Sequence, residues 1–214
     1  MTKREDPQWG KTEDTALQAA IATFHFTNCV PQVAELNTKE WGKLETFILE
    51  KTSVPDKLRV SVFTGPVLAV EDPVFISKVG GEDVQIPTLF WKIVYYSTDG
   101  KTVSMAGFLM GQQNSFVKKG IVVQKVQPSA ERLAIQAEIF QNFEDAAIYQ
   151  VNINTIEKLS GLRFAAAGQP FMDSRPLKLI IEKVQVPATA EARKGINVLE
   201  DTHEQVLFSN IKLG

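Results

Sequence analysis

An α+β fold with a mixed or antiparallel sheet and several helices is predicted by three observations along the sequence. Residues 87–110 combine a continuously apolar stretch, an Asp-Gly turn and a returning strand, which is the pattern of a hairpin buried on both faces. Residues 23–51 change from period-two alternation to the three-and-four spacing of a helix. Further short extended runs alternate with stretches that begin at helix-capping residues, so both strands and helices are expected in the rest of the chain.

The composition is that of an ordinary globular protein. The chain has 214 residues, of which 44% are apolar and 22% charged, enough to bury a core as one domain or slightly more. The formal net charge of −2 gives no overall electrostatic footprint for nucleic acid, although a local basic patch can hide within a neutral average. The single cysteine, Cys29, excludes an intrachain disulfide. No apolar run reaches the roughly 18 residues of a membrane span.

A helix and a strand are expected before residue 30. Residues 1–12 are polar and contain Pro and Gly, so they form a loop, and Thr12 or Asp14 can cap a helix of two or three turns. Residues 23–28 alternate in polarity and predict a strand with Asn28 on the face opposite His25.

A second helix is expected from about residue 38 to residue 51. Its apolar face is formed by Trp41, Leu44 and Ile48, which are spaced three and four apart. Asn37 at the helix start and Glu45 two turns later lie near one edge of this face, separated by roughly 12 Å along the axis. Together with Asn28, these two side chains can converge on one site.

The rest of the chain is expected to contain strands and helices joined by turns. Residues 58–70 predict a strand broken at Gly65-Pro66, and residues 112–120 predict a polar loop. Further expected elements are short strands at 121–126 and 148–151, a mostly helical stretch at 129–143, a helix capped by Asn152 or Asn154 and ended by Gly161, and weakly alternating runs at 177–186 and 206–213.

Each candidate site residue also has an ordinary structural explanation. Asn37, followed three residues later by Glu40, is typical of a helix capping arrangement. Glu45 alone is more often a solvated helix residue, and Asn28 before a proline-containing loop is usually a loop former. Cys29 is expected to be a small buried side chain, because nothing near it in the sequence would activate the thiol. Spacing alone leaves both interpretations open.

A denser pattern occupies residues 27–45 and reads T-N-x-x-P-Q followed by N-x-x-x-W-x-x-L-E. Its fixed positions are Thr27, Asn28, Pro31, Gln32, Asn37, Trp41, Leu44 and Glu45. The pattern closely resembles the DNA/RNA non-specific endonucleases, which are ββα-metal nucleases. Further matches in the family's order are residues 3–10, 59–66, 72–73, 86–87, 90–92 and 156–164. The resemblance covers about residues 1–164 and implies a nuclease domain there, with residues 165–214 as an unassigned C-terminal extension.

The resemblance implies a role for each candidate. Asn37 would be the direct protein ligand of a divalent metal, Mg²⁺ or Mn²⁺, because a hard cation takes oxygen ligands and keeps much of its water shell. Glu45 and Asn28 would be supporting catalytic residues, with Glu45 ordering water at the metal and Asn28 positioning the site by hydrogen bonds. The implied substrates are DNA and RNA, and no membrane partner is expected.

One part of the family's site has no match in this chain. The family's general base is a histidine in an Asp-Arg-Gly-His motif, and that motif belongs immediately upstream of the position of Met1. The chain contains only His25, which is expected to be structural, and His203, which lies beyond the resemblance. We therefore expect an N-terminally incomplete nuclease core that lacks its first site strand. The exposed sheet edge would favour a homodimer.

Two functions follow from these observations. The first is a metal-dependent, sugar-non-specific endonuclease whose activity is impaired in this chain, because a general base typically contributes about 10²–10⁴-fold. The alternative is a non-catalytic nuclease-fold remnant that binds nucleic acid or another partner. Members of the resembled family are often exported, and the polar first residues contain no signal-peptide core. The compartment is left open.

Overall fold

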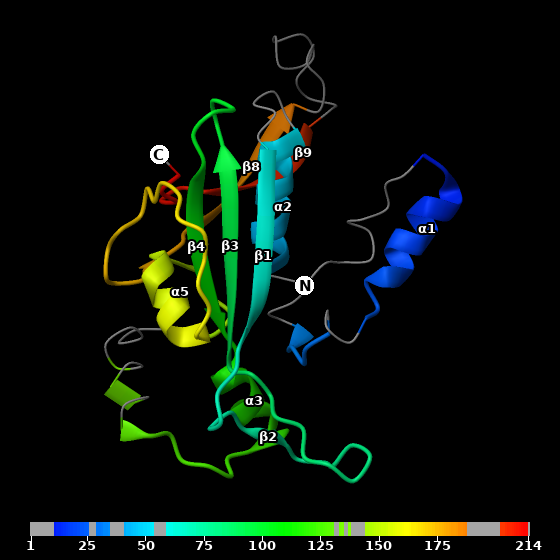
Figure 1. Cartoon of the computed structure of the whole chain (residues 1–214), viewed down its shortest axis with the longest axis vertical. Coiled ribbons are helices and arrows are strands. Elements are labelled where there is room, and N and C mark those ends of the chain that lie inside the picture. The colour runs from blue at the N-terminus through cyan, green and yellow to red at the C-terminus, as the bar shows by residue number, and fades with distance from the viewer. Residues whose placement is uncertain are drawn as a thin grey trace.

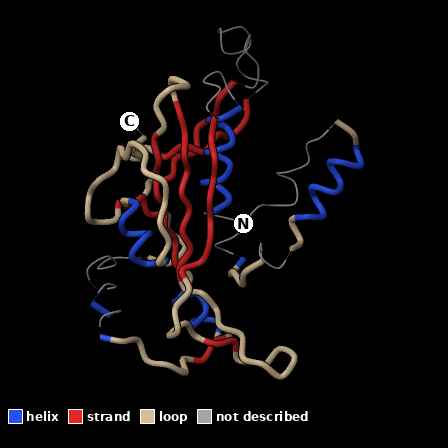
Figure 2. The backbone as a smooth tube through the Cα atoms, viewed as in Figure 1, coloured by secondary structure: helices blue, strands red, loops and turns tan. Residues whose placement is uncertain are grey.

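The computed structural model describes residues 11–25, 29–34, 41–53, 59–130, 133–134, 137, 144–187 and 202–213. Within these ranges the fold is α+β, with an antiparallel sheet as its centre (Figures 1 and 2). The helices are α1 (Glu13–Ala22), α2 (Trp41–Ser53), α3 (Gln113–Lys119) and α5 (Ile153–Ser160). The strands are β1 (Arg59–Val67), β2 (Val74–Phe75), β3 (Leu89–Ser97), β4 (Ser104–Gly111), β5 (Val122–Val123), β6 (Tyr149–Val151), β7 (Leu177–Lys178), β8 (Ile181–Pro187) and β9 (Thr202–Phe208). The predicted fold class is confirmed.

The central sheet has five strands in the order β1-β3-β4-β6-β7, and every neighbouring pair is antiparallel. The predicted hairpin forms its middle, with Leu89 paired to Gly111 and Tyr96 paired to Ser104. Strands β3 and β4 are buried along nearly their whole length, as their continuously apolar sequences predict. Two smaller two-stranded sheets pair β2 with β5 and β8 with β9.

Helices cover both faces of the central sheet, which makes a three-layer arrangement (Figure 1). On one face, the apolar side of α2 and strand β9 pack against β3 and β4, and the rings of Phe47 and Phe208 meet edge to face at 5.1 Å. On the other face, Ile156 of α5 packs against Ile93 and Leu109. Side chains alternate across a strand, so successive residues of β3 serve two separate cores.

The predicted helix ends agree with the structure. The side chain of Thr12 accepts a hydrogen bond from the backbone N–H of Thr15 and caps α1. Asn152 caps α5 in the same way through Thr155, and Gly161 ends that helix with a φ of +71°. Helix α2 buries the predicted stripe of Trp41, Leu44 and Ile48, while the residues before its first described turn lie outside the described ranges.

Two predictions for the middle of the chain were wrong. Strand β1 continues through Gly65 and Pro66, because β1 is an edge strand, where a missing backbone N–H costs little. The Trp91 indole donates to the Pro66 carbonyl at 3.1 Å, and a side chain at Gly65 would lie 2.9 Å from the indole ring. Residues 112–120 were expected to form a loop, but they contain helix α3, ended by Gly120 with a φ of +63°.

The remaining predictions have mixed outcomes. The strand expected at 121–126 is reduced to the two residues of β5, and the strand at 148–151 is present as β6. Most of the stretch 129–143 lies outside the described residues, although residues 130, 133, 134 and 137 are helical. In the described part of the chain, no helix is long and apolar enough to cross a membrane.

The C-terminal residues pack onto the central sheet. The Gln150 side chain makes two hydrogen bonds with the backbone of Lys212, at 2.8 and 2.9 Å, and the Tyr96 hydroxyl donates to the Leu213 carbonyl at 2.8 Å. The division into residues 1–164 and an extension stays a prediction. So does the homodimer, although β1 does form an edge of the sheet.

Candidate active site

Glu45 lies on the edge of α2 that faces β3. Its side chain is 15% exposed, and its Oε1 atom accepts a hydrogen bond from Lys92 Nζ at 3.1 Å. The Lys92 side chain is only 2% exposed. Its ammonium group also lies 4.8 Å from the centre of the Trp41 ring, one helical turn before Glu45. One buried cation therefore touches both an aromatic ring and a carboxylate of the same helix.

The strand register explains why Lys92 is buried. Side chains alternate across β3, so Lys92 shares the α2-facing side of the strand with Phe90 and Val94, both in the core beneath α2. Burying a cation is costly unless it is paired. Here the carboxylate of Glu45 supplies the opposite charge, and the Trp41 ring supplies a further favourable contact. Glu45 is thus held in place, unlike a solvated helix residue.

Lys92 is a buried neighbour of Glu45 to which the sequence assigned no role. In the sequence it is one matching position of the family resemblance, inside an apolar stretch. The available signal was the single charge in that stretch, because a charge in a strand buried on both faces needs a partner. The partner itself is 47 residues away in the sequence, so the pair is visible only in the tertiary structure.

The loop of residues 29–34 carries Pro31 and Gln32, which end the first half of the sequence motif. Val33 is buried in the core beneath α2, and its backbone N–H donates to Oε1 of Gln112 at 2.9 Å. Gln32 is partly buried, and its Nε2 atom is enclosed with no hydrogen-bond partner among the described residues. The loop is therefore attached to the sheet through Val33, with the motif residue Gln32 next to the attachment.

The structure answers only part of the prediction that three residues converge. Glu45 lies at the inner edge of α2, as its helical spacing predicts, and its catalytic role stays a prediction. Asn28 and Asn37 lie outside the described residues, so their approach to Glu45 stays a prediction. The structure shows that the chain between them reaches the same side of the sheet as α2, because Val33 belongs to the same core cluster as Trp41.

Two other expectations for this segment were wrong. Residues 23–25 form a turn and not a strand, since Thr23 is the C-cap of α1 and its backbone N–H donates to the Ala20 carbonyl. His25 follows in the bend and is exposed. Cys29 is also exposed, because Val33, four residues later, is the loop side chain that enters the core.

The oxygen donors of the candidate site suit a hard divalent cation. The predicted direct ligand is the amide oxygen of Asn37, with the carboxylate of Glu45 beside it to order water, and such oxygen donors suit Mg²⁺ better than softer metals. Within the described ranges, no group of three or more His, Cys, Asp or Glu side chains could hold a metal. A single Asn ligand would leave the remaining coordination positions to water and substrate, as Mg²⁺ prefers.

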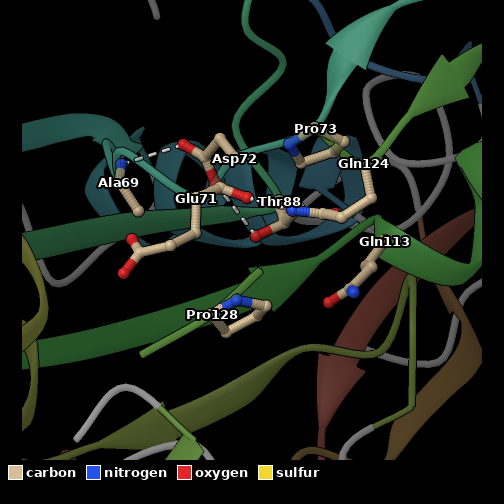
Figure 3. Close-up of a pocket in the computed structure, with 8 residues that line it drawn as sticks. All are labelled: Ala69, Glu71, Asp72, Pro73, Thr88, Gln113, Gln124 and Pro128. Carbon is tan, nitrogen blue, oxygen red and sulfur yellow. Dashed lines mark hydrogen bonds between the residues drawn. The ribbon is translucent and has the colours of Figure 1, made fainter. Parts of the chain in front are cut away.

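A polar pocket near the end of the sheet has a structural explanation (Figure 3). Asp72 is buried, and its Oδ2 atom accepts a hydrogen bond from the Ala69 backbone N–H at 2.9 Å, which closes the turn after β1. Its Oδ1 atom faces the Thr88 hydroxyl at 3.5 Å. These hydrogen bonds give the buried carboxylate a structural place in the turn.

Comparison with known proteins agrees with the sequence motif. The family described as DNA/RNA non-specific endonuclease matches residues 1–171. The match includes α1, the loop of residues 29–34, α2, strands β1 to β6 and α5. A comparison with curated proteins finds no match.

Proposed function

Because the chain belongs to the DNA/RNA non-specific endonuclease family, we propose that it is built to hydrolyse phosphodiester bonds of DNA and RNA at a divalent-metal site beside Glu45. The observation that carries this proposal is the buried contact between Glu45 and Lys92. It holds a carboxylate at the position of the family motif, on the helix that shares a core cluster with Val33 of the loop between the two motif asparagines.

Each proposed site residue has a distinct task. The Asn37 side-chain oxygen would hold the cation, Mg²⁺ or Mn²⁺, and Asn28 would orient the surrounding groups by hydrogen bonds. When bound, the cation supplies Lewis-acid polarisation of the phosphodiester and compensates charge on the leaving oxygen. Glu45, fixed by Lys92, accepts hydrogen bonds from water and so orders it beside the substrate.

We further propose that the 214-residue chain alone is a weak nuclease. It contains two histidines, His25 and His203, and neither matches the family's base motif. His25 is exposed in the bend after α1. Without a positioned general base, turnover is expected to fall by about 10²–10⁴-fold, while the metal and the supporting residues keep a residual rate.

Plasmid nicking tests this proposal. Purified chain is incubated with supercoiled plasmid and Mg²⁺, alongside the variants Asn37→Ala and Glu45→Gln and the control Glu82→Gln, which makes the same change at an exposed loop tip. We expect slow, Mg²⁺-dependent nicking that both site variants abolish and the control retains. Fast nicking that Asn37→Ala abolishes would refute the proposal that this chain is weak for want of a general base. Nicking unaffected by Asn37→Ala would refute the assignment of the site.

The missing match to a base also supports the second candidate function, a non-catalytic protein that keeps the nuclease fold and binds nucleic acid. The net charge of −2 argues against strong non-specific binding, since such affinity comes mainly from neutralising phosphates. Retardation of DNA that weakens with salt, without any cleavage, would favour this function. No retardation at low salt would exclude it.

A further inference from the structure

Gln112 is the most completely enclosed polar side chain near the motif loop. It follows the last residue of β4 and is 0% exposed. Its Nε2 atom donates to the Pro31 carbonyl at 3.1 Å and to the Pro87 carbonyl at 2.7 Å. Its Oε1 atom accepts from the Val33 backbone N–H at 2.9 Å. One amide thus makes three hydrogen bonds, two of them to the loop of residues 29–34.

The partners of Gln112 fix its orientation. The Val33 N–H can only donate and the two carbonyls can only accept, so the amide oxygen must face the loop N–H and the nitrogen must face the carbonyls. The backbone of Gln112 is fixed as well, because its N–H donates to the Thr88 carbonyl at 2.9 Å and its carbonyl accepts from the Phe116 N–H. We call the three side-chain hydrogen bonds of Gln112, to Pro31, Val33 and Pro87, the Gln112 clamp. The clamp is held in place because Gln112 lies between the end of β4 and the start of α3 and is bonded to the chain entering β3.

The clamp holds the middle of the site motif. In the sequence, Asn28 lies three residues before Pro31, and Asn37 lies four residues after Val33. Residues 29–33, which lie between the two asparagines, belong to no helix or strand that would set their path. Packing of Val33 explains why the loop is near the sheet, but the paired bonds to Pro31 and Val33 also fix its register along the chain.

We propose that Gln112 is a positioning residue of the nuclease site, which acts by fixing the register of the loop between Asn28 and Asn37. The inference rests on the proposed metal site and names a residue outside its motif. Residues that orient metal ligands without touching the metal typically change metal affinity by about 10–100-fold when they are replaced. Among the described residues of the motif loop, Gln112 forms its side-chain hydrogen bonds with the backbone of residues 31 and 33.

The test measures Mn²⁺ binding to the full chain by electron paramagnetic resonance, where bound Mn²⁺ removes the signal of the free ion. The variant Gln112→Met removes the amide at similar volume. Gln113→Met is the matched control, because Gln113 is the next residue, is exposed and begins α3. We expect Gln112→Met to weaken Mn²⁺ affinity at least tenfold at a temperature where circular dichroism shows it folded. Gln113→Met should bind as the wild type does.

A second measurement needs no variant. Hydrogen exchange of the wild-type Val33 amide should be slow, because its N–H is buried and bonded to Oε1 of Gln112. Unprotected exchange would overturn the clamp, even where Gln112→Met fails to fold. Mn²⁺ affinity unchanged in folded Gln112→Met would overturn the positioning role. If the wild type binds no Mn²⁺, or Asn37→Ala binds it equally well, the proposed metal site fails, and a protected Val33 amide then leaves Gln112 with a structural role only.

Discussion

Replacing Lys92 with methionine should destabilise the protein far more than a surface lysine replacement does. The change keeps the length of the side chain but removes the ammonium that Glu45 contacts at 3.1 Å in the core beneath α2. Breaking a buried ion pair by removing one partner costs about 3–5 kcal/mol. Glu45 keeps 15% exposure to water, so we expect the lower end, a loss of about 3 kcal/mol in unfolding free energy.

Urea denaturation followed by tryptophan fluorescence measures this loss of unfolding free energy. In thermal denaturation, each kcal/mol lowers the Tm of a chain of this size by about 2–4 °C, so Lys92→Met should melt about 6–12 °C below the wild type. The matched control is Lys125→Met, because Lys125 pairs with Asp83 at a site where both side chains are exposed. Exposed pairs contribute about 0–1 kcal/mol, and the control should therefore change little.

A double variant separates the ion pair from the packing of the lysine stem. Lys92→Met with Glu45→Gln removes both charges at nearly constant volume, and neutral replacements of a whole buried pair are often tolerated. The double variant should therefore be more stable than Lys92→Met alone. If Lys92→Met costs no more than Lys125→Met, or if the double variant is no more stable than the single one, the reasoning about a buried charge is wrong.

Two further predictions concern the sheet and its hairpin. A Cβ added at Gly107 would lie 2.8 Å from Ile156 Cδ1 and 2.9 Å from the Val151 carbonyl. Gly107→Ala should therefore lower the unfolding free energy measured in urea by about 1–3 kcal/mol, as overpacked core positions do. An unchanged urea midpoint would show that α5 moves away freely. Several hydrogen bonds lower the pKa of Asp99 to about 2, and the bond donated by the backbone N–H of Thr102 contributes most to this shift. Because this folded pKa lies below the ordinary value of about 3.8, the carboxylate stabilises the fold above that value, and the contribution disappears as the pH falls through 2. The urea midpoint should fall from pH 4 to pH 2 more steeply in the wild type than in Asp99→Asn, and equal slopes would contradict this.

Much of the fold was predictable because its causes are local in the sequence. The continuous apolar character of β3 predicts burial on both faces, and the Asp-Gly turn predicts the hairpin. Capping by Thr12 and Asn152 depends on residues three positions away. The wrong predictions have causes outside the local sequence. Strand β1 passes through Pro66 because it is an edge strand, and the Pro66 carbonyl accepts a hydrogen bond from the Trp91 indole N–H.

The sequence by itself determined the α+β class, the amphipathic helix that carries Glu45, and the motif that the family match confirms. Only the tertiary structure decided which side chains hold that motif in place. Lys92 meets Glu45 across 47 positions of sequence, and Gln112 meets Val33 across 79. The physical reason is that a buried polar group must find a partner wherever the fold provides one, and local patterning shows the need for a partner but not its position.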